Sequence, residues 1–201
     1  MMGYRYEIRF SGAGGQGLIL ISIILAEAVG IYEGKFVSQT QSYGAEAWGG
    51  SSKAEVIISD EEIDYPEVMN LDLLLAMNQK SCDAYYRDLR QGGILIVDST
   101  FVHQVPTPRA FSIPFTHIAR EELKQEKSAN IVALGALTQL ISIVSPKSIE
   151  AAVLARVPKG TEKMNRAALK AGIRAARQAK KARKEIEIVP EISEEELRDA
   201  Y

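Results

Sequence analysis

The alternation of apolar and polar positions along the chain predicts strands and helices in turn. Near the N-terminus, the apolar residues Tyr4, Tyr6, Ile8 and Phe10 alternate with polar ones, a period of two that is typical of a strand with one polar face. Further strands are predicted at residues 36–40, 53–59, 71–78 and 94–100, with a short one within 101–115. Helices are predicted at residues 16–29 and 79–91 and over most of the chain after residue 117. This order favours one α/β domain with a parallel sheet and a helical C-terminal third.

Two of the predicted helices are apolar on every side. They cover residues 16–29 and 130–144. A helix without a polar face must be covered all round. Either the core of this chain covers both helices, or another subunit covers one of them.

A glycine-rich turn joins the first strand to the first helix. Its candidate binding residues are Gly12, Gly14, Gly15, Gln16 and Gly17. Three of the glycines fit the pattern G-x-G-x-x-G, in which backbone N–H groups can hold a phosphate. A dinucleotide site also needs a carboxylate at the end of the second strand, and residues 38–42 read Ser-Gln-Thr-Gln-Ser. The polar face of the first strand also argues against a central strand that is buried on both sides. A free-standing dinucleotide-binding oxidoreductase therefore remains an alternative of lower rank.

The composition limits the possible chemistry. The chain has 201 residues and a net charge of −2, which does not favour nucleic-acid binding. With one cysteine, Cys82, and two histidines, His103 and His117, it cannot hold an iron–sulfur cluster or a structural zinc ion alone. We expect no metal site, no apolar span of membrane length and a reducing, cytoplasmic location.

Several single residues have local structural interpretations. Asn78 and Asp98 end strands and are expected to cap the next turn. Asn130 is expected to cap its helix, with Ser128 as the alternative. Lys127 lies beside that helix start and is either a solvated lysine or an anion ligand.

A glycine-punctuated loop is predicted at residues 42–52. A loop after a strand end is where α/β folds place binding sites. Trp48 is the chain's one tryptophan, a residue type enriched at interface hot spots. The loop either faces a partner or a shared cleft, or packs as an ordinary loop. Its candidate contact residues are Ser42, Tyr43, Glu46, Trp48, Gly49 and Gly50.

The last helix carries a basic stripe and leads into an acidic tail. The stripe consists of Lys163, Arg166, Lys170, Arg174, Arg177, Lys181 and Lys184. We divide the chain into a domain at residues 1–184 and an acidic tail at residues 185–201. The stripe is either a solvated helix face or a docking surface, so a regulatory binding protein is a second alternative.

Five motifs together give a family resemblance. They are GAGGQG from Gly12, SYGAEAWGG from Ser42, LDLLLAMN from Leu71, ANIVALGAL from Ala129 and NRAALKAG from Asn165. In this order and spacing, up to about residue 175, the chain resembles the gamma subunit of 2-oxoacid:ferredoxin oxidoreductases, with the 2-oxoglutarate branch favoured over the pyruvate and ketoisovalerate branches. These enzymes convert a 2-oxo acid and coenzyme A to acyl-CoA and CO2, and pass electrons to ferredoxin.

The resemblance implies an accessory subunit with a Rossmann-like, mostly parallel sheet flanked by helices. Thiamine diphosphate, Mg²⁺ and the iron–sulfur clusters would belong to alpha, beta and possibly delta subunits, so the isolated chain is expected to be inactive. The glycine turn would face the cleft that coenzyme A enters. The chain departs from the family at Trp48, where an arginine is usual, and in its C-terminal extension.

Overall fold

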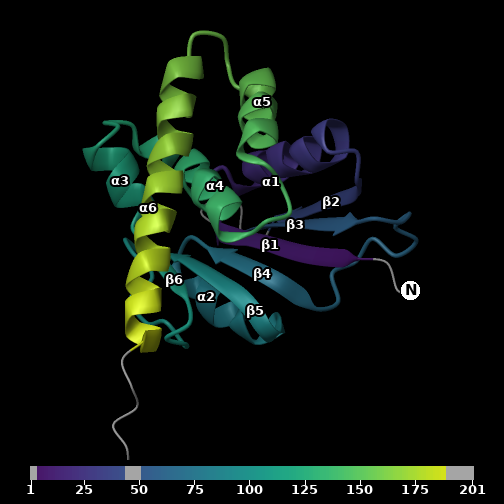
Figure 1. Ribbon diagram of the computed structural model, residues 1–201, viewed down its shortest axis with the longest axis horizontal. Helices are drawn as coiled ribbons and strands as arrows, with labels where there is room; N and C mark the ends of the chain where they lie inside the picture. Colours follow the sequence, from purple (N-terminus) through teal and green to yellow (C-terminus); the bar gives the residue numbers. More distant parts are fainter. Residues whose placement is uncertain (1–3, 44–50, 189–201) are drawn as a thin grey trace, which may run out of the picture.

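The computed structural model describes residues 4–43 and 51–188, which form one six-stranded sheet with helices on both faces (Figure 1). The strand order is β2-β3-β1-β4-β5-β6. The strands are β1 (Arg5–Ala13), β2 (Phe36–Tyr43), β3 (Ser51–Ser59), β4 (Leu71–Ala76), β5 (Leu89–Asp98) and β6 (Phe111–Ile113). Strands β1, β4, β5 and β6 pair in parallel, whereas β3 is antiparallel to both β1 and β2. The predicted mostly parallel α/β fold is confirmed.

The helices cover the two faces of the sheet unequally. They are α1 (Leu18–Glu27), α2 (Gln79–Tyr85), α3 (Phe115–Glu121), α4 (Ala129–Leu140), α5 (Pro146–Arg156) and α6 (Glu162–Ile188). Figure 1 shows α1, α4 and α5 above the sheet, α6 running from that side down past β6, and α2 below the sheet. The main core lies under the first group, and a smaller core lies between α2 and strands β4 and β5.

Helix α4 is buried within its own chain at every residue except Gln139. Helix α6 crosses it so closely that a Cβ atom added at Gly135 would lie 2.3 Å from the carbonyl oxygen of Leu169. A Cβ atom at Gly172 would lie 1.9 Å from the carbonyl oxygen of Val132. The motifs ANIVALGAL and NRAALKAG therefore supply the two glycines that permit this crossing. Helix α1, in contrast, leaves Leu20 38% exposed.

Strand β1 is central in the sheet although one of its faces is polar. The expectation that a strand with this polar face would not be central and buried on both sides is therefore wrong. Arg9 and Glu7 are 7% and 4% exposed, and ion pairs compensate their burial. Arg9 pairs with Glu55 at 2.6 Å and with Asp88, and its guanidinium lies 4.8 Å from the ring centre of Tyr85. A buried charge is tolerated when it is paired and hydrogen-bonded in this way.

Glu7 connects the sheet to the segment before β4. Its carboxylate accepts hydrogen bonds of 2.7 Å from the backbone N–H groups of Met69 and Asn70, and one of 2.6 Å from Arg5. The backbone N–H of Glu7 donates to Asp72 at 2.7 Å. Charge-assisted bonds of this kind are stronger than neutral ones, and they hold the amino-terminal edge of the sheet in place.

Several predicted element boundaries differ from the structure, and the largest differences concern residues 79–91 and the loop at 42–52. The predicted helix at residues 79–91 ends at Tyr85, and a short 3₁₀ turn, Tyr86–Asp88, leads directly into β5. Strand β5 contains Gly92 at φ +80° and shifts its register against β4, so this glycine forms an irregularity inside a strand and does not end a helix. The predicted loop at 42–52 is shorter because the β2–β3 ladder continues to the pair Tyr43–Ser52.

The predicted caps have mixed outcomes. Asn78 caps α2 by accepting a hydrogen bond of 2.9 Å from the N–H of Ser81, as predicted. Asp98 accepts one of 3.0 Å from the N–H of Thr100, also as predicted. Ser128 occupies the N-cap position of α4 without a side-chain cap, whereas Oδ1 of Asn130, inside the first turn, accepts a hydrogen bond of 2.8 Å from the N–H of Ile131.

No helix in the described part of the chain is long and apolar enough to cross a membrane.

Candidate functional site

The carboxyl ends of β1 and β4 mark the point where the chain switches between the faces of the sheet. After β1 the chain enters α1 on one face, and after β4 it enters α2 on the other. In open α/β sheets, ligands bind in the crevice that such a switch creates. The predicted glycine turn, residues 12–17, lies at this position.

Gln16 holds the turn in shape. Its side-chain Oε1 accepts a hydrogen bond of 2.7 Å from the N–H of Ala13, and its Nε2 donates to the carbonyl oxygen of Met77 at 3.4 Å. The N–H of Met77 donates to the carbonyl oxygen of Ser11 at 2.8 Å. The side-chain amide of Gln16 and the N–H of Met77 therefore fasten the turn after β1 to the end of β4.

The glycines of the turn have different reasons to be glycine. Gly12 has no room for a side chain, because a Cβ atom there would lie 2.3 Å from Oε1 of Gln16. Gly15 and Gly17 have φ angles of +88° and +72°, which favour glycine. A Cβ atom at Gly15 would meet open space, whereas one at Gly17 would strike Asn130.

Asn130 ties the turn to helix α4. Its Nδ2 donates to the carbonyl oxygen of Gly17 at 3.2 Å. Its Oδ1 accepts a hydrogen bond of 2.8 Å from the N–H of Ile131 in the first turn of α4, so one side chain joins the turn before α1 to the start of its own helix. The first turn of α1 has neither a side-chain cap nor an acidic residue. Its N–H groups and the helix dipole therefore favour an anion at this end.

A pocket of about 450 Å³ opens beside the turn. This volume lies in the range of roughly 300–1,000 Å³ found for ligand pockets. Residues from five segments form its wall, namely Gly15, Gln16, Met77, Phe101, Thr116, Gln125, Glu126, Lys127 and Ala129. The pocket thus includes two of the predicted turn residues and Lys127.

Asp98 holds one residue of the pocket wall, Thr116, in place. It is fully buried and accepts hydrogen bonds from the N–H of Thr116 at 3.2 Å and from its hydroxyl at 2.5 Å. Its other oxygen holds Thr100, whose hydroxyl accepts a bond of 3.2 Å from the N–H of His117. Asp98 is therefore a structural residue that fixes the start of α3 against the end of β5.

The charged groups at the rim differ in their partners. Arg120 donates to Glu126 at 2.9 Å, and this hydrogen bond and the positive charge lower the pKa of the Glu126 carboxyl. Lys127 is exposed and makes no ion pair with any described residue. The rim thus presents one uncompensated positive charge next to the glycine turn.

Of the candidate residues in the predicted loop at 42–52, the structure describes only Ser42 and Tyr43. Ser42 is exposed at the end of β2 and pairs with Lys53, and Tyr43 is the last residue of that strand. Because Ala13 pairs with Ser51, this end of the β2–β3 hairpin adjoins the glycine turn. The candidates Glu46, Trp48, Gly49 and Gly50 lie outside the described residues.

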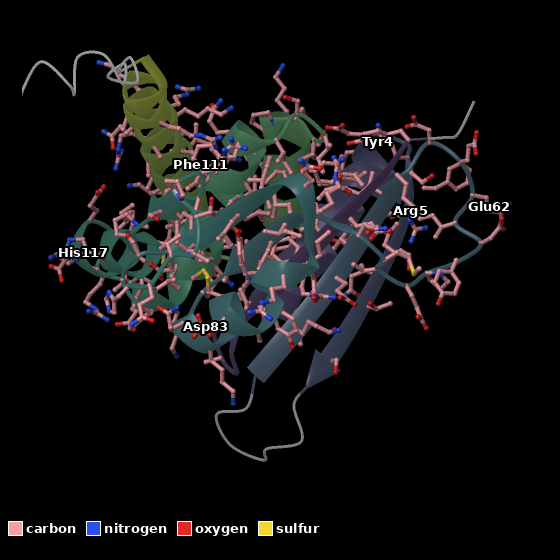
Figure 2. All side chains as sticks on the ribbon, turned by 90° about the horizontal axis from the view of Figure 1, so that it is seen from below. Tyr4, Arg5, Glu62, Asp83, Phe111 and His117 are labelled. Carbon is pink, nitrogen blue, oxygen red and sulfur yellow. The ribbon has the colours of Figure 1, made fainter. Side chains whose placement is uncertain are left out.

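Sequence reasoning missed Phe101 and Thr116 as pocket residues. Phe101 is 39% exposed, which is unusual for a phenylalanine, and it lines the pocket after β5. Their positions in the sequence could have indicated both residues. Phe101 follows β5 and Thr116 follows β6, and the carboxyl ends of these parallel strands lie at the same edge of the sheet as the glycine turn. His103 is exposed and lies outside the pocket wall, as does His117, which Figure 2 shows at the periphery.

Dinucleotide binding finds no support in the geometry. In the dinucleotide-binding arrangement, the strand that carries the ribose carboxylate lies beside β1. Here the antiparallel β3 separates β2 from β1, and the end of β2 carries Ser42 and Tyr43. Among the described residues, no group of three His, Cys, Asp or Glu side chains could hold a metal ion.

Comparisons with known proteins agree with the motif analysis. The family model "Pyruvate ferredoxin/flavodoxin oxidoreductase" matches residues 7–175. The "2-oxoglutarate synthase subunit KorC" of Methanocaldococcus jannaschii is 49% identical over 178 residues, which cover 87% of this chain and 95% of the relative. The protein of the same name from Methanothermobacter thermautotrophicus is 44% identical over 180 residues, with coverage of 86% and 95%.

A solved structure extends the agreement to the fold. The "keto/oxoacid ferredoxin oxidoreductase, gamma subunit" from Geobacter sulfurreducens superposes with a TM-score of 0.80 at 47% identity, covering 88% of this chain and 98% of that one. The family resemblance read from the five motifs is confirmed, and the names of the two relatives agree with the favoured 2-oxoglutarate branch. This protein is therefore a member of the pyruvate ferredoxin/flavodoxin oxidoreductase family, of the gamma-subunit type.

Proposed function

We propose that this chain is the gamma subunit of a cytoplasmic 2-oxoglutarate:ferredoxin oxidoreductase and that it contributes to assembly and to the coenzyme A cleft. The complex would convert a 2-oxo acid, coenzyme A and oxidised ferredoxin to acyl-CoA, CO2 and reduced ferredoxin. The observation that carries the proposal is the 49% identity to a 2-oxoglutarate synthase subunit over 95% of that subunit's length.

The residues of this chain favour an accessory role. Its one cysteine, Cys82, is fully buried, and burial raises the pKa of its thiol, which disfavours the thiolate needed for ligation or attack. The Asp98 carboxylate is fully buried and accepts hydrogen bonds from Thr100 and Thr116, so it is engaged in a structural role. In this proposal alpha, beta and possibly delta subunits hold thiamine diphosphate, Mg²⁺ and the iron–sulfur clusters.

The pocket at the switch point suits an anionic part of coenzyme A. Gly14 and Gly15 are exposed, so a phosphate could approach the backbone closely. Lys127 would add a positive charge, and Phe101 an exposed ring for apolar contact. The volume of about 450 Å³ admits a portion of the ligand, so we propose that a partner subunit completes the cleft.

The test compares two glycines with nearly equal backbone angles. Gly15 has φ +88° at the pocket, and Gly160 has φ +89° at the turn before α6, and neither has atoms within 4 Å of an added Cβ. Valine at either position should cost roughly 1–3 kcal/mol of backbone strain. In a complex reconstituted with the other subunits, Gly15→Val should raise the KM for coenzyme A or weaken assembly, while Gly160→Val should do neither.

Equal behaviour of the two variants would refute a coenzyme A role for the turn and leave it as a packing device. The accessory role has a separate test. The purified chain alone should show no 2-oxoglutarate oxidation with a viologen dye as electron acceptor, and turnover by the single chain would contradict the proposal.

A further inference from the structure

A second large hollow, which shares no lining residue with the pocket at the glycine turn, lies between strand β6 and the C-terminal half of α6. Its volume is about 590 Å³, and Ala110, Phe111, Ala179 and Ala182 give it an apolar wall. The guanidinium of Arg183 lies 4.9 Å from the ring centre of Phe111 and donates to the carbonyl oxygen of Arg109 at 3.0 Å. Figure 2 shows Phe111 next to α6. We refer to this hollow as the β6–α6 groove.

The groove continues into a positively charged pocket. Arg109 borders both the groove and a neighbouring hollow of about 380 Å³, which Arg87 and Arg90 also line. Arg90 is paired with Asp72 at 2.5 Å. Arg87 and Arg109 are exposed, and their guanidinium groups have no carboxylate partner among the described residues. The combined surface is apolar at one end and positively charged at the other.

One wall of the groove belongs to an extension beyond the family. The family match ends at residue 175, whereas Ala179, Ala182 and Arg183 follow it on α6. The chain continues with Val-Pro-Glu-Ile-Ser-Glu-Glu-Glu-Leu-Arg-Asp-Ala-Tyr at residues 189–201. This segment carries five carboxylates and one arginine, interspersed with apolar side chains. Its chemistry is complementary to a groove that is partly apolar and partly cationic.

We propose that the β6–α6 groove binds residues 189–201 of the same chain. The carboxylates of this segment would pair with Arg87 and Arg109, and its apolar side chains would cover the wall formed by Phe111, Ala179 and Ala182. Exposed ion pairs are individually weak, so the covalent connection of the segment to α6 is needed for the contact to form.

The length of the segment permits this contact. From Arg183 to the end of α6 at Ile188 the helix rises about 7.5 Å, at 1.5 Å per residue. Thirteen extended residues reach up to roughly 43–47 Å. A short tether gives an effective concentration in the millimolar range, so an intrinsic dissociation constant of roughly a tenth of that concentration fills the groove and weakens the binding of a competing peptide about tenfold.

The experiment measures competition for the groove. The probe is a fluorescein-labelled synthetic peptide of residues 189–201, and its anisotropy is followed with the full chain and with a chain that ends at Ile188. The shortened chain should bind the peptide at least tenfold more tightly than the full chain, whose own segment competes. Arg87→Glu with Arg109→Glu in the shortened chain should weaken binding at least tenfold.

Matched controls separate the groove from general charge attraction. Lys147→Glu with Lys159→Glu changes two exposed positive charges by the same amount at α5 and the turn after it, and should leave peptide binding unchanged. A scrambled peptide of the same composition should bind at least fivefold more weakly. Equal binding to the full and shortened chains would overturn the proposal and mean that the groove is open to an acidic segment of another protein. No binding to the shortened chain would refute it outright.

Discussion

Substitution of Gly172 by alanine should destabilise the protein, although helix propensity alone predicts the opposite. Alanine in place of glycine inside a helix normally gains about 1 kcal/mol. At Gly172, however, the added Cβ atom would lie 1.9 Å from the carbonyl oxygen of Val132 and 2.8 Å from the N atom of Ala136. Both atoms belong to the α4 backbone, which cannot rotate away as a side chain can.

The magnitude follows from the required separation of the helices. Ordinary van der Waals contact begins at 3.4 Å, so α4 and α6 must move apart by up to about 1.5 Å near Val132. Overpacking of this kind costs roughly 1–3 kcal/mol and occasionally more. Because the obstacle is backbone, we expect a net loss of about 2 kcal/mol after the propensity gain, which lowers Tm by roughly 4–8 °C in a chain of this size.

Thermal and urea unfolding followed by circular dichroism would measure the loss. The control is Ala167→Gly at an exposed site of the same helix, which should lose only the propensity of about 1 kcal/mol. A Gly172→Ala variant as stable as the wild type, or more stable, would show that the two helices do not cross in close contact.

Two further predictions concern titratable groups. Cys82 is fully buried and burial raises the pKa of its thiol, so it should react with a thiol reagent only on unfolding, whereas an Ala84→Cys variant at a neighbouring exposed site should react at once. Partial burial alone would raise the pKa of the Glu33 carboxyl, but hydrogen bonds from the Ser145 backbone N–H, at 2.6 Å, and from nearby hydroxyls outweigh it and lower the pKa. Because the pKa is lower in the folded state than in the unfolded state, the ionised carboxylate stabilises the protein at pH values above the ordinary carboxyl range. This stabilisation is lost as the pH falls through the folded-state pKa. Glu33→Gln should therefore be less stable than the wild type by about 1 kcal/mol at pH 7, and the difference should shrink below about pH 4. A difference that is independent of pH would refute the assigned contact.

The amino-acid sequence alone was enough to predict most of the strands, the glycine turn and the family. The period-two pattern around Ile8 and Phe10 and the glycine turn after β1 are properties of short segments, because strand alternation and turn conformation depend on neighbouring residues. The cap at Asn78 is local in the same sense, since its bond spans three residues. The five ordered motifs were sufficient to indicate the gamma-subunit type.

The contacts between distant segments could not be predicted from local patterns. The insertion of β3 between β1 and β2 depends on pairings across the chain, and it made a charged strand central because Glu55 lies opposite Arg9. Asn130 binds the carbonyl oxygen of Gly17, 113 residues away, as well as the N–H of Ile131 in its own helix. The helix predicted at residues 79–91 gave way to β5 because pairing with β4 satisfies the backbone from Leu89 onward. Such outcomes depend on which hydrogen-bond and packing partners the complete fold supplies, and local propensity does not contain that information.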